Sequence, residues 1–172
     1  NRFPILLKQN QMIQRIQSIY LFIVCVMSVV ALFCNIGSYN CDGITIADFT
    51  NFSFSTYEGF KSFHSAGPWA LGVLLIVVSF LSLFSIMLYT KRMRQLRLTI
   101  MSSILLVGYI LTYAFFVYVY NEKLALFSPE AEISFRLSIM GCMPAISLIL
   151  NILAIHGIRK DEALVRSLDR IR

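Results

Sequence analysis

Four long apolar runs separated by polar segments dominate the hydrophobicity pattern of the chain. The clearest covers residues 66–90, which contain no charged side chain and are followed at once by the basic segment Lys91–Arg97. At about 1.5 Å per residue, a helix of this length reaches roughly 37 Å, enough to cross a hydrocarbon core of about 30 Å. Because the run shows scattered serines but no polar face, it is typical of a membrane-spanning helix.

Three further runs, residues 16–36, 98–120 and 137–158, are also long enough to cross a bilayer and contain no Asp, Glu, Lys or Arg. The apolar content of 58% exceeds the 45–50% or so of soluble domains. Residues 12–172 are therefore predicted to form a single four-span membrane domain, and residues 1–11 an N-terminal extension. The predicted fold class is an all-α membrane protein, a bundle of four transmembrane helices.

The longest connection, residues 37–65, lies between the first two runs. Asp42-Gly43 is a turn signal, and residues 44–60 are rich in aromatic and β-branched side chains, which are typical of short strands. We expect a small β-hairpin close to the membrane surface. An irregular loop whose aromatic side chains dip into the interface stays open as the alternative.

Lys and Arg are distributed unequally among the segments outside the four runs. The N-terminal segment, the connection between the second and third runs, and the C-terminal tail carry 12 of them, whereas the other two connections carry 3. With an even number of spans, the first three segments share one side of the membrane, which the positive-inside rule makes cytoplasmic. Both termini are therefore predicted to be cytoplasmic, and the long first connection extracytoplasmic.

Small and polar residues recur at helical spacing within the second and fourth runs. Asn151 is the strongest of them, because an amide in hydrocarbon needs a hydrogen-bonding partner. We interpret the set as helix–helix contacts, with a substrate path as the less favoured alternative. The candidates are Ser79, Ser82, Gly141, Ala145, Ser147 and Asn151.

An aromatic stripe on the third run, formed by Tyr109, Tyr113, Phe116 and Tyr120, is interpreted as packing or as a lipid-facing belt rather than as a cofactor site. It falls in the half of that run predicted to lie toward the outer membrane surface.

The C-terminal tail, residues 159–172, combines an apolar stripe with four arginines and is predicted to form a cytoplasmic amphipathic helix. It would lie on an anionic inner leaflet, pack beneath its own bundle or dock a cytoplasmic partner. The candidate residues for such a surface are Leu164, Arg166, Leu168, Arg170 and Ile171.

No residue pattern indicates catalysis. The cysteines lack metal-ligand spacing, no GxSxG motif occurs, and His64 and His156 fall on opposite sides of the predicted membrane. The absence of charged residues from the four runs argues against an ion-coupled transporter. We therefore predict no catalytic, cofactor-binding or metal-binding residue. Whether Cys34 and Cys41 form a disulfide stays open.

Three stretches resemble a known family: MIQRIQSIYL (residues 12–21), LYTKRMRQLRL (88–98) and ILAIHGIRKDEALVRSLDRIR (152–172). They are similar to small four-span integral membrane proteins of Bacteroidota that are known only as a domain of unknown function. The resemblance implies a location in the inner membrane of a Gram-negative bacterium. It implies no activity, ligand or catalytic residue.

The favoured hypothesis is a non-enzymatic inner-membrane protein with a structural, assembly or interaction role in a membrane complex. The expected partners are the lipid bilayer and other membrane proteins or a second copy of the chain, and no nucleic acid is expected. The alternative is a small passive channel or transporter subunit, and a membrane enzyme comes third. A continuous polar lumen along Ser79, Ser82 and Asn151 would favour the channel, whereas a close-packed centre would oppose it.

Overall fold

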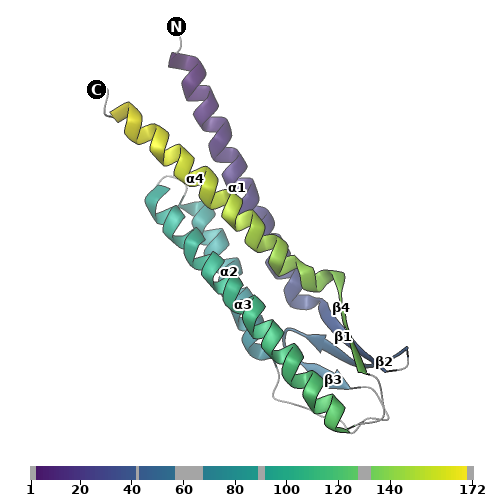
Figure 1. The fold of residues 1–172 in the computed structure, drawn as a ribbon. Coiled ribbons are helices and arrows are strands. Elements are labelled where there is room, and N and C mark those ends of the chain that lie inside the picture. Colours follow the sequence, from purple (N-terminus) through teal and green to yellow (C-terminus); the bar gives the residue numbers. More distant parts are fainter. Residues whose placement is uncertain (1–2, 42, 57–67, 89–91, 128–132, 170–172) are drawn as a thin grey trace.

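In the computed structural model, four helices lie along one another and a four-stranded antiparallel sheet lies at one end of them (Figure 1). The structure describes residues 3–41, 43–56, 68–88, 92–127 and 133–169. Within the first and last helices, the described side chains begin at Gln17 and end at Ala163.

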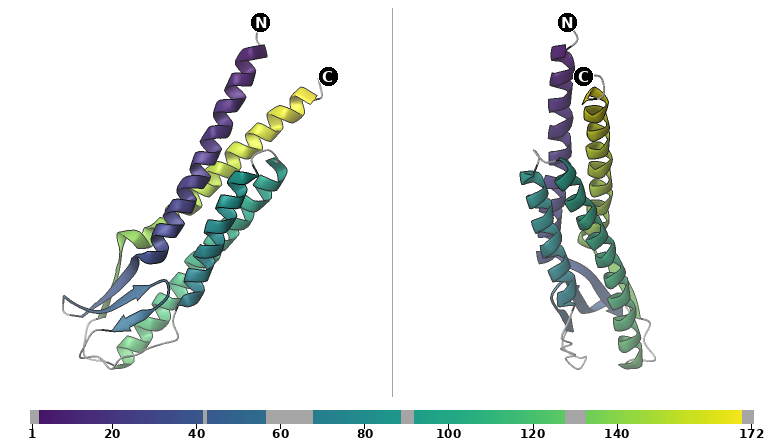
Figure 2. Two further views of the ribbon diagram at one scale, coloured as in Figure 1. Left: turned by 180° about the vertical axis from the view of Figure 1, so that it is seen from behind. Right: turned by 90° about the vertical axis from the view of Figure 1, so that its left-hand side faces the viewer.

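Each of the four helices packs against two neighbours. α1 contacts α2 and α4, and α3 contacts the same two helices. Both chain termini lie at one end of the molecule, where α1 and α4 extend beyond the end of α2 and the beginning of α3 (Figures 1 and 2). The bounds are Phe3–Phe33 for α1, Trp69–Met87 for α2, Arg92–Phe127 for α3 and Met143–Asp169 for α4.

α3 is much longer than α2, with 36 residues against 19. These lengths correspond to about 54 Å and about 28 Å. No proline follows Pro68 until Pro129, so the sequence contains no strong helix breaker within α3. The C-terminal part of α3 therefore continues past the beginning of α2 and lies alongside the sheet (Figure 1).

The sheet has the strand order β3-β2-β1-β4, and every neighbouring pair is antiparallel. β1 and β2 form a hairpin whose turn contains Gly43 at φ +82°, a conformation that glycine adopts without strain. The predicted hairpin is therefore present, in place of the irregular loop. The strands are Asn35–Cys41 (β1), Ile44–Thr50 (β2), Phe54–Thr56 (β3) and Ile133–Leu137 (β4).

The prediction of an all-α fold is wrong, because the sheet is an integral part of the structure. Residues 35 and 36, predicted to end the first span, begin β1, and Leu137, predicted to begin the fourth span, ends β4. β4 comes from the segment between α3 and α4 and joins the sheet by pairing with β1, where Gly37 pairs with Leu137. Its sequence ISFRL alternates apolar and polar residues, but this short pattern runs directly into an apolar run, and its partner strand lies far away in the sequence.

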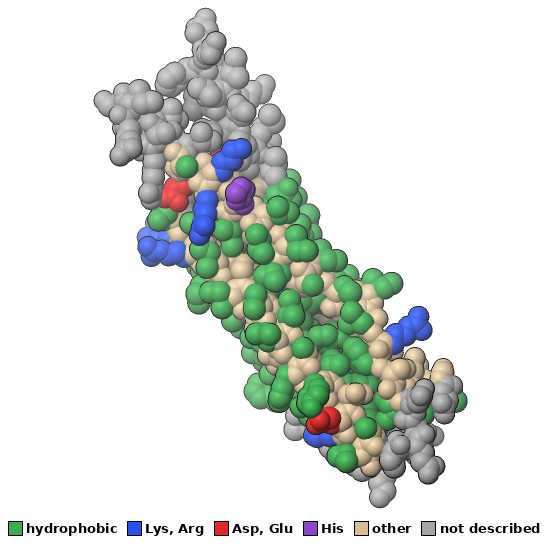
Figure 3. Space-filling model, in the orientation of Figure 1, with side chains coloured by type: hydrophobic (Ala, Val, Ile, Leu, Met, Phe, Trp, Pro, Cys, Tyr) green, Lys and Arg blue, Asp and Glu red, His purple; other side chains and the backbone are tan. Residues whose placement is uncertain are grey.

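Three helical segments are long and apolar enough to cross a membrane: Trp69–Met87, Met93–Leu126 and Ile139–Ala163. In α1, the described apolar part is shorter and covers Gln17–Phe33. Figure 3 shows hydrophobic side chains covering the middle of the visible face, with charged side chains toward the two ends. Length, composition and this distribution suggest that the protein is located in a membrane.

Candidate functional site

The structure separates the six predicted packing residues. Ala145 is exposed on α4. Gly141 lies before α4, in the short 3-10 helix η1 (Ile139–Cys142), where it approaches the backbone of β1. The other four are buried between the helices: Ser79, Ser82, Ser147 and Asn151.

Asn151 connects α4 to α3. Its Nδ2 donates a hydrogen bond to Ser102 Oγ at 2.8 Å, and Ser102 Oγ donates to the carbonyl of Thr99 at 3.0 Å. About one turn nearer the chain termini, the hydroxyl oxygens of Thr99 and Ser85 lie 3.1 Å apart and join α3 to α2. A chain of amide and hydroxyl groups thus links three helices.

The hydroxyl of Ser102 is the member of this chain that we expect to be most sensitive to substitution. Ser102→Ala leaves the Asn151 amide buried without a partner and is expected to lower stability by about 1 to 2 kcal/mol. Ser103→Ala is the matched control, because the Ser103 hydroxyl also donates to the Thr99 carbonyl at 3.0 Å but has no bond to Asn151. Thermal unfolding of the purified protein in detergent should rank the two variants, and equal losses would contradict the role of Asn151.

The bundle interior is filled near the sheet by large apolar side chains. Leu75, Val78, Leu106 and Tyr109 are fully or almost fully buried and belong to one continuous hydrophobic cluster. The polar chain around Asn151 therefore meets a close-packed apolar region before it reaches the sheet.

The side chains of the predicted tail residues lie outside the part of the chain that the structure describes. α4 continues without a break to Asp169, so the first part of the tail prolongs the fourth apolar segment as one helix. The side chains of Leu164, Arg166 and Leu168 lie outside the described residues, as do Arg170 and Ile171 altogether.

The structure excludes the disulfide that the sequence left open. Neither Cys34 nor Cys41 takes part in a disulfide, and the extended strand β1, which Cys34 precedes and Cys41 ends, separates them. Seven residues of extended chain separate their Cα atoms by about 20 Å, whereas a disulfide requires about 4.4–6.8 Å. Among the described residues, no group of three or more His, Cys, Asp or Glu side chains could hold a metal ion.

Asn51 holds the sheet to three helices. It lies in the turn between β2 and β3 and is 0% exposed. Its Nδ2 donates to the carbonyl of Ala31 at 2.6 Å, its Oδ1 accepts from the Tyr109 hydroxyl at 2.8 Å, and its carbonyl accepts from the Gly72 amide at 3.2 Å. Ala31 and Gly72 belong to a helix C-terminus and a helix N-terminus, so Asn51 satisfies backbone groups that those helices leave unpaired.

No sequence signal distinguished Asn51 from an ordinary turn residue. Asn is common in turns, and its neighbours Thr50, Phe52 and Ser53 show no motif. Its role depends on the approach of three helix segments that are distant in the sequence.

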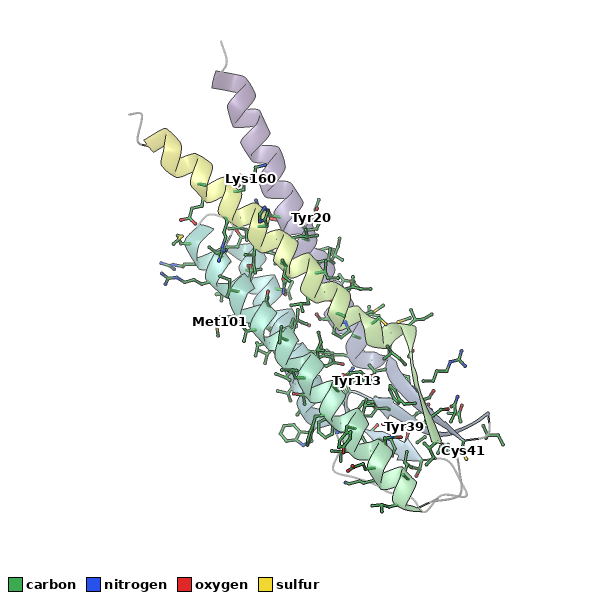
Figure 4. All side chains as sticks on the ribbon, viewed as in Figure 1. Tyr20, Tyr39, Cys41, Met101, Tyr113 and Lys160 are labelled. Atoms are coloured by element: carbon green, nitrogen blue, oxygen red, sulfur yellow. The ribbon has the colours of Figure 1, made fainter. Side chains whose placement is uncertain are left out.

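Aromatic side chains attach the inner face of the sheet to α3. The Tyr39 hydroxyl donates to the carbonyl of Val117 at 3.0 Å, and the rings of Phe54 and Tyr120 stack with centroids 4.3 Å apart. Figure 4 shows Tyr39 and Tyr113 where α3 runs past the sheet. Burial raises the pKa of the Tyr39 phenol above its ordinary value, which keeps it a neutral hydrogen-bond donor. Of the two interpretations of the α3 stripe, packing is therefore the one that the structure supports at Tyr120.

The opposite face of the sheet is polar. Ser38 pairs with Asp48 on one side and with Arg136 on the other, so these three residues form one row across β2, β1 and β4. Asn35 Nδ2 donates to Asp48 Oδ1 at 2.8 Å. The row lines a polar concavity of about 360 Å³ at the junction between the sheet and the helices. This concavity is the candidate binding site of the described structure.

These observations define a class: four long, largely apolar helices combined with a small four-stranded antiparallel sheet that carries a polar concavity. A family model described as a domain of unknown function, DUF4293, matches residues 13–171, and the chain therefore belongs to this family. No curated protein matches the chain. The family match agrees with the resemblance to a domain of unknown function.

Proposed function

We propose that the protein is a non-enzymatic integral protein of a bacterial inner membrane, which holds a rigid β-sheet at the extracytoplasmic surface. The four helices would cross the bilayer with both termini in the cytoplasm. The sheet would act as a structural or interaction module for another membrane protein or a second copy of the chain. The apolar middle of the face shown in Figure 3 supports the membrane location. The excess of Lys and Arg in the N-terminal segment, in the segment between α2 and α3 and in the C-terminal tail supports this orientation.

The observation that carries the proposal is the attachment of the sheet. Asn51 binds the ends of α1 and α2 and the Tyr109 side chain, and α3 supports the inner face of the sheet along its C-terminal part. A surface held in this way loses little conformational entropy when a partner binds, which favours recognition. It is a less suitable geometry for a moving gate.

A passive channel or transporter subunit is the second candidate. In its favour, the hydroxyl oxygens of Ser28, Ser82 and Ser147 are buried in the bundle without a hydrogen-bond partner. Against it, Leu75, Leu106 and other buried apolar side chains fill the bundle near the sheet. This close packing is inconsistent with the continuous polar lumen that conduction requires.

Labelling of single cysteines tests the orientation. In a variant whose four native cysteines are replaced by serine, Ile44→Cys lies in the hairpin, where Ile44 is 71% exposed, and Arg97→Cys lies on exposed α3 surface near the connection to α2. A membrane-impermeant maleimide should label residue 44 in intact spheroplasts and residue 97 only after lysis. The reverse pattern would overturn the orientation, and recovery of the protein in the soluble fraction would overturn the membrane location.

The same two positions test the interaction role. A photo-crosslinking residue at position 44 should capture another membrane protein or a second copy in native membranes, whereas position 97 serves as the control. Capture of the same products with equal yield from both positions would count against the sheet as the interaction module.

A further inference from the structure

The polar concavity lies on the sheet, and residues of β1, β2 and β4 and the start of η1 line it. Its lining combines Asn35 after α1, Ser38 on β1, Asp48 on β2, Arg136 on β4 and Ser138 before η1. Its volume of about 360 Å³ exceeds what a single water or ion needs. The site therefore has room for a small organic group.

Opposite charges stand on the same face of the sheet. Asp48 pairs with Ser38 from one side, and Arg136 pairs with it from the other. The Cα atoms of Asp48 and Arg136 therefore lie about 10 Å apart across three strands. The Asn35 amide donates to Asp48 and orients its carboxylate. Because a carboxylate accepts several hydrogen bonds, contacts with protein groups and with a ligand are compatible.

The Asn35 side chain supports the carboxylate of Asp48 rather than contacting a ligand. Its Oδ1 atom is buried, so it lies out of reach of a ligand in the concavity. The concavity thus has a carboxylate acceptor, Asp48, at one end of the row and a guanidinium donor, Arg136, at the other.

Large apolar side chains lie beside these polar groups. Leu137 and Ile139 line the concavity and are 47% and 84% exposed, and Phe33, the last residue of α1, is 83% exposed. These residues mark the level at which the apolar helices give way to the polar sheet. In a bilayer, hydrocarbon gives way to headgroups at such a level.

We propose that this concavity binds the headgroup of a phospholipid of the phosphoethanolamine type. Arg136 binds the phosphate, since a guanidinium matches the geometry of phosphate oxygens. The Asp48 carboxylate accepts hydrogen bonds from the primary ammonium, which has three N–H donors. The acyl chains run past Leu137 and Ile139 along the helices. The inference rests on the proposed membrane location.

This arrangement predicts selectivity among lipids that share the same phosphate. A phosphocholine headgroup has a cation without N–H donors, so it cannot donate a hydrogen bond to the Asp48 carboxylate. A phosphoglycerol headgroup has no cation to pair with Asp48. Phosphoethanolamine is therefore the headgroup that satisfies both ends of the row.

Native mass spectrometry of the purified full chain, incubated with phosphatidylethanolamine, phosphatidylglycerol and phosphatidylcholine of identical acyl chains, tests the proposal. We expect at least tenfold stronger retention of phosphatidylethanolamine than of phosphatidylcholine. Arg136→Gln should abolish the preference, whereas Arg159→Gln, the same change at an exposed site near the other end of the molecule, should leave it intact. Asp48→Asn keeps an acceptor for Asn35 and should reduce phosphatidylethanolamine retention to that of phosphatidylglycerol or below.

Equal retention of the three lipids by the wild-type chain, or an unchanged preference in Arg136→Gln, would overturn the proposal. Water-soluble glycerophosphoethanolamine, which carries the headgroup without acyl chains, tests whether the ligand is the lipid or the free headgroup. If the protein bound this compound as tightly as the lipid, the lipid assignment would be overturned. The comparison of the three lipids on the wild-type chain tests the proposal even if a variant fails to fold. If the protein fractionates with membranes but shows no headgroup preference, the lipid-binding inference is refuted and the proposed membrane location is not. Fractionation and labelling measure that location separately.

Discussion

Asn51→Leu is expected to lower the free energy of unfolding by about 3 kcal/mol, the largest effect that we predict for a single polar side chain. The substitution removes the donor to the Ala31 carbonyl and the acceptor of the Tyr109 hydroxyl, both at buried positions. Each lost buried hydrogen bond that leaves an unsatisfied partner costs about 1–3 kcal/mol. For a chain of this size, the melting temperature should fall by roughly 6–12 °C.

Thermal unfolding in detergent measures this loss, and Asn121→Leu is the matched control because Asn121 is exposed on α3. Tyr109→Phe removes only the bond to Asn51 Oδ1. A double-mutant cycle with Asn51→Leu should therefore show a coupling on the order of 1 kcal/mol. If Asn51→Leu unfolded at the wild-type temperature, Asn51 would not hold the sheet to the helices.

Gly141→Ala is expected to destabilise the protein by about 2–3 kcal/mol, since overpacking at an immobile contact is costly. A Cβ atom at position 141 would lie 2.5 Å from the carbonyl oxygen of Ile36. That oxygen cannot easily move, because it accepts hydrogen bonds from the Ser138 amide at 3.2 Å and from the Tyr113 hydroxyl at 3.4 Å. The glycine thus allows η1 to pack against β1 where the sheet joins α4.

Gly108→Ala provides the matched control for this substitution. Gly108 lies inside α3, and a Cβ atom there would meet nothing within 4 Å. Alanine in place of glycine within a helix should therefore raise stability by about 0.5–1 kcal/mol. The two substitutions should shift the melting temperature in opposite directions, and a shift of the same sign would contradict the close contact at Gly141.

The predicted packing residues show what helical periodicity can predict and what it cannot. Ser82, Ser147 and Asn151 are buried, and helical periodicity by itself identifies which residues of a helix lie on one face. Periodicity does not identify the partner of a face, and Ala145 proved to be exposed while Gly141 packs on a strand.

The candidate site was not predicted from the sequence. Its residues were assigned to a span end (Asn35), a loop (Asp48) and the polar boundary of the fourth run (Arg136). They meet only because β4 pairs with β1. Alternation of apolar and polar residues can indicate a strand, but it does not identify a pairing partner at such a sequence distance.

The sequence by itself determined the long apolar helices, the turn at Gly43 and the segregation of basic residues, because each of these depends on neighbours within one or two turns of chain. Only the tertiary structure decided that strands from the α1–α2 and α3–α4 segments join one sheet, that Asn51 links three helices and that Asp48 and Arg136 share one face. Those features arise from contacts between segments brought together by folding, and the free energy of such contacts is not encoded in local hydrophobicity.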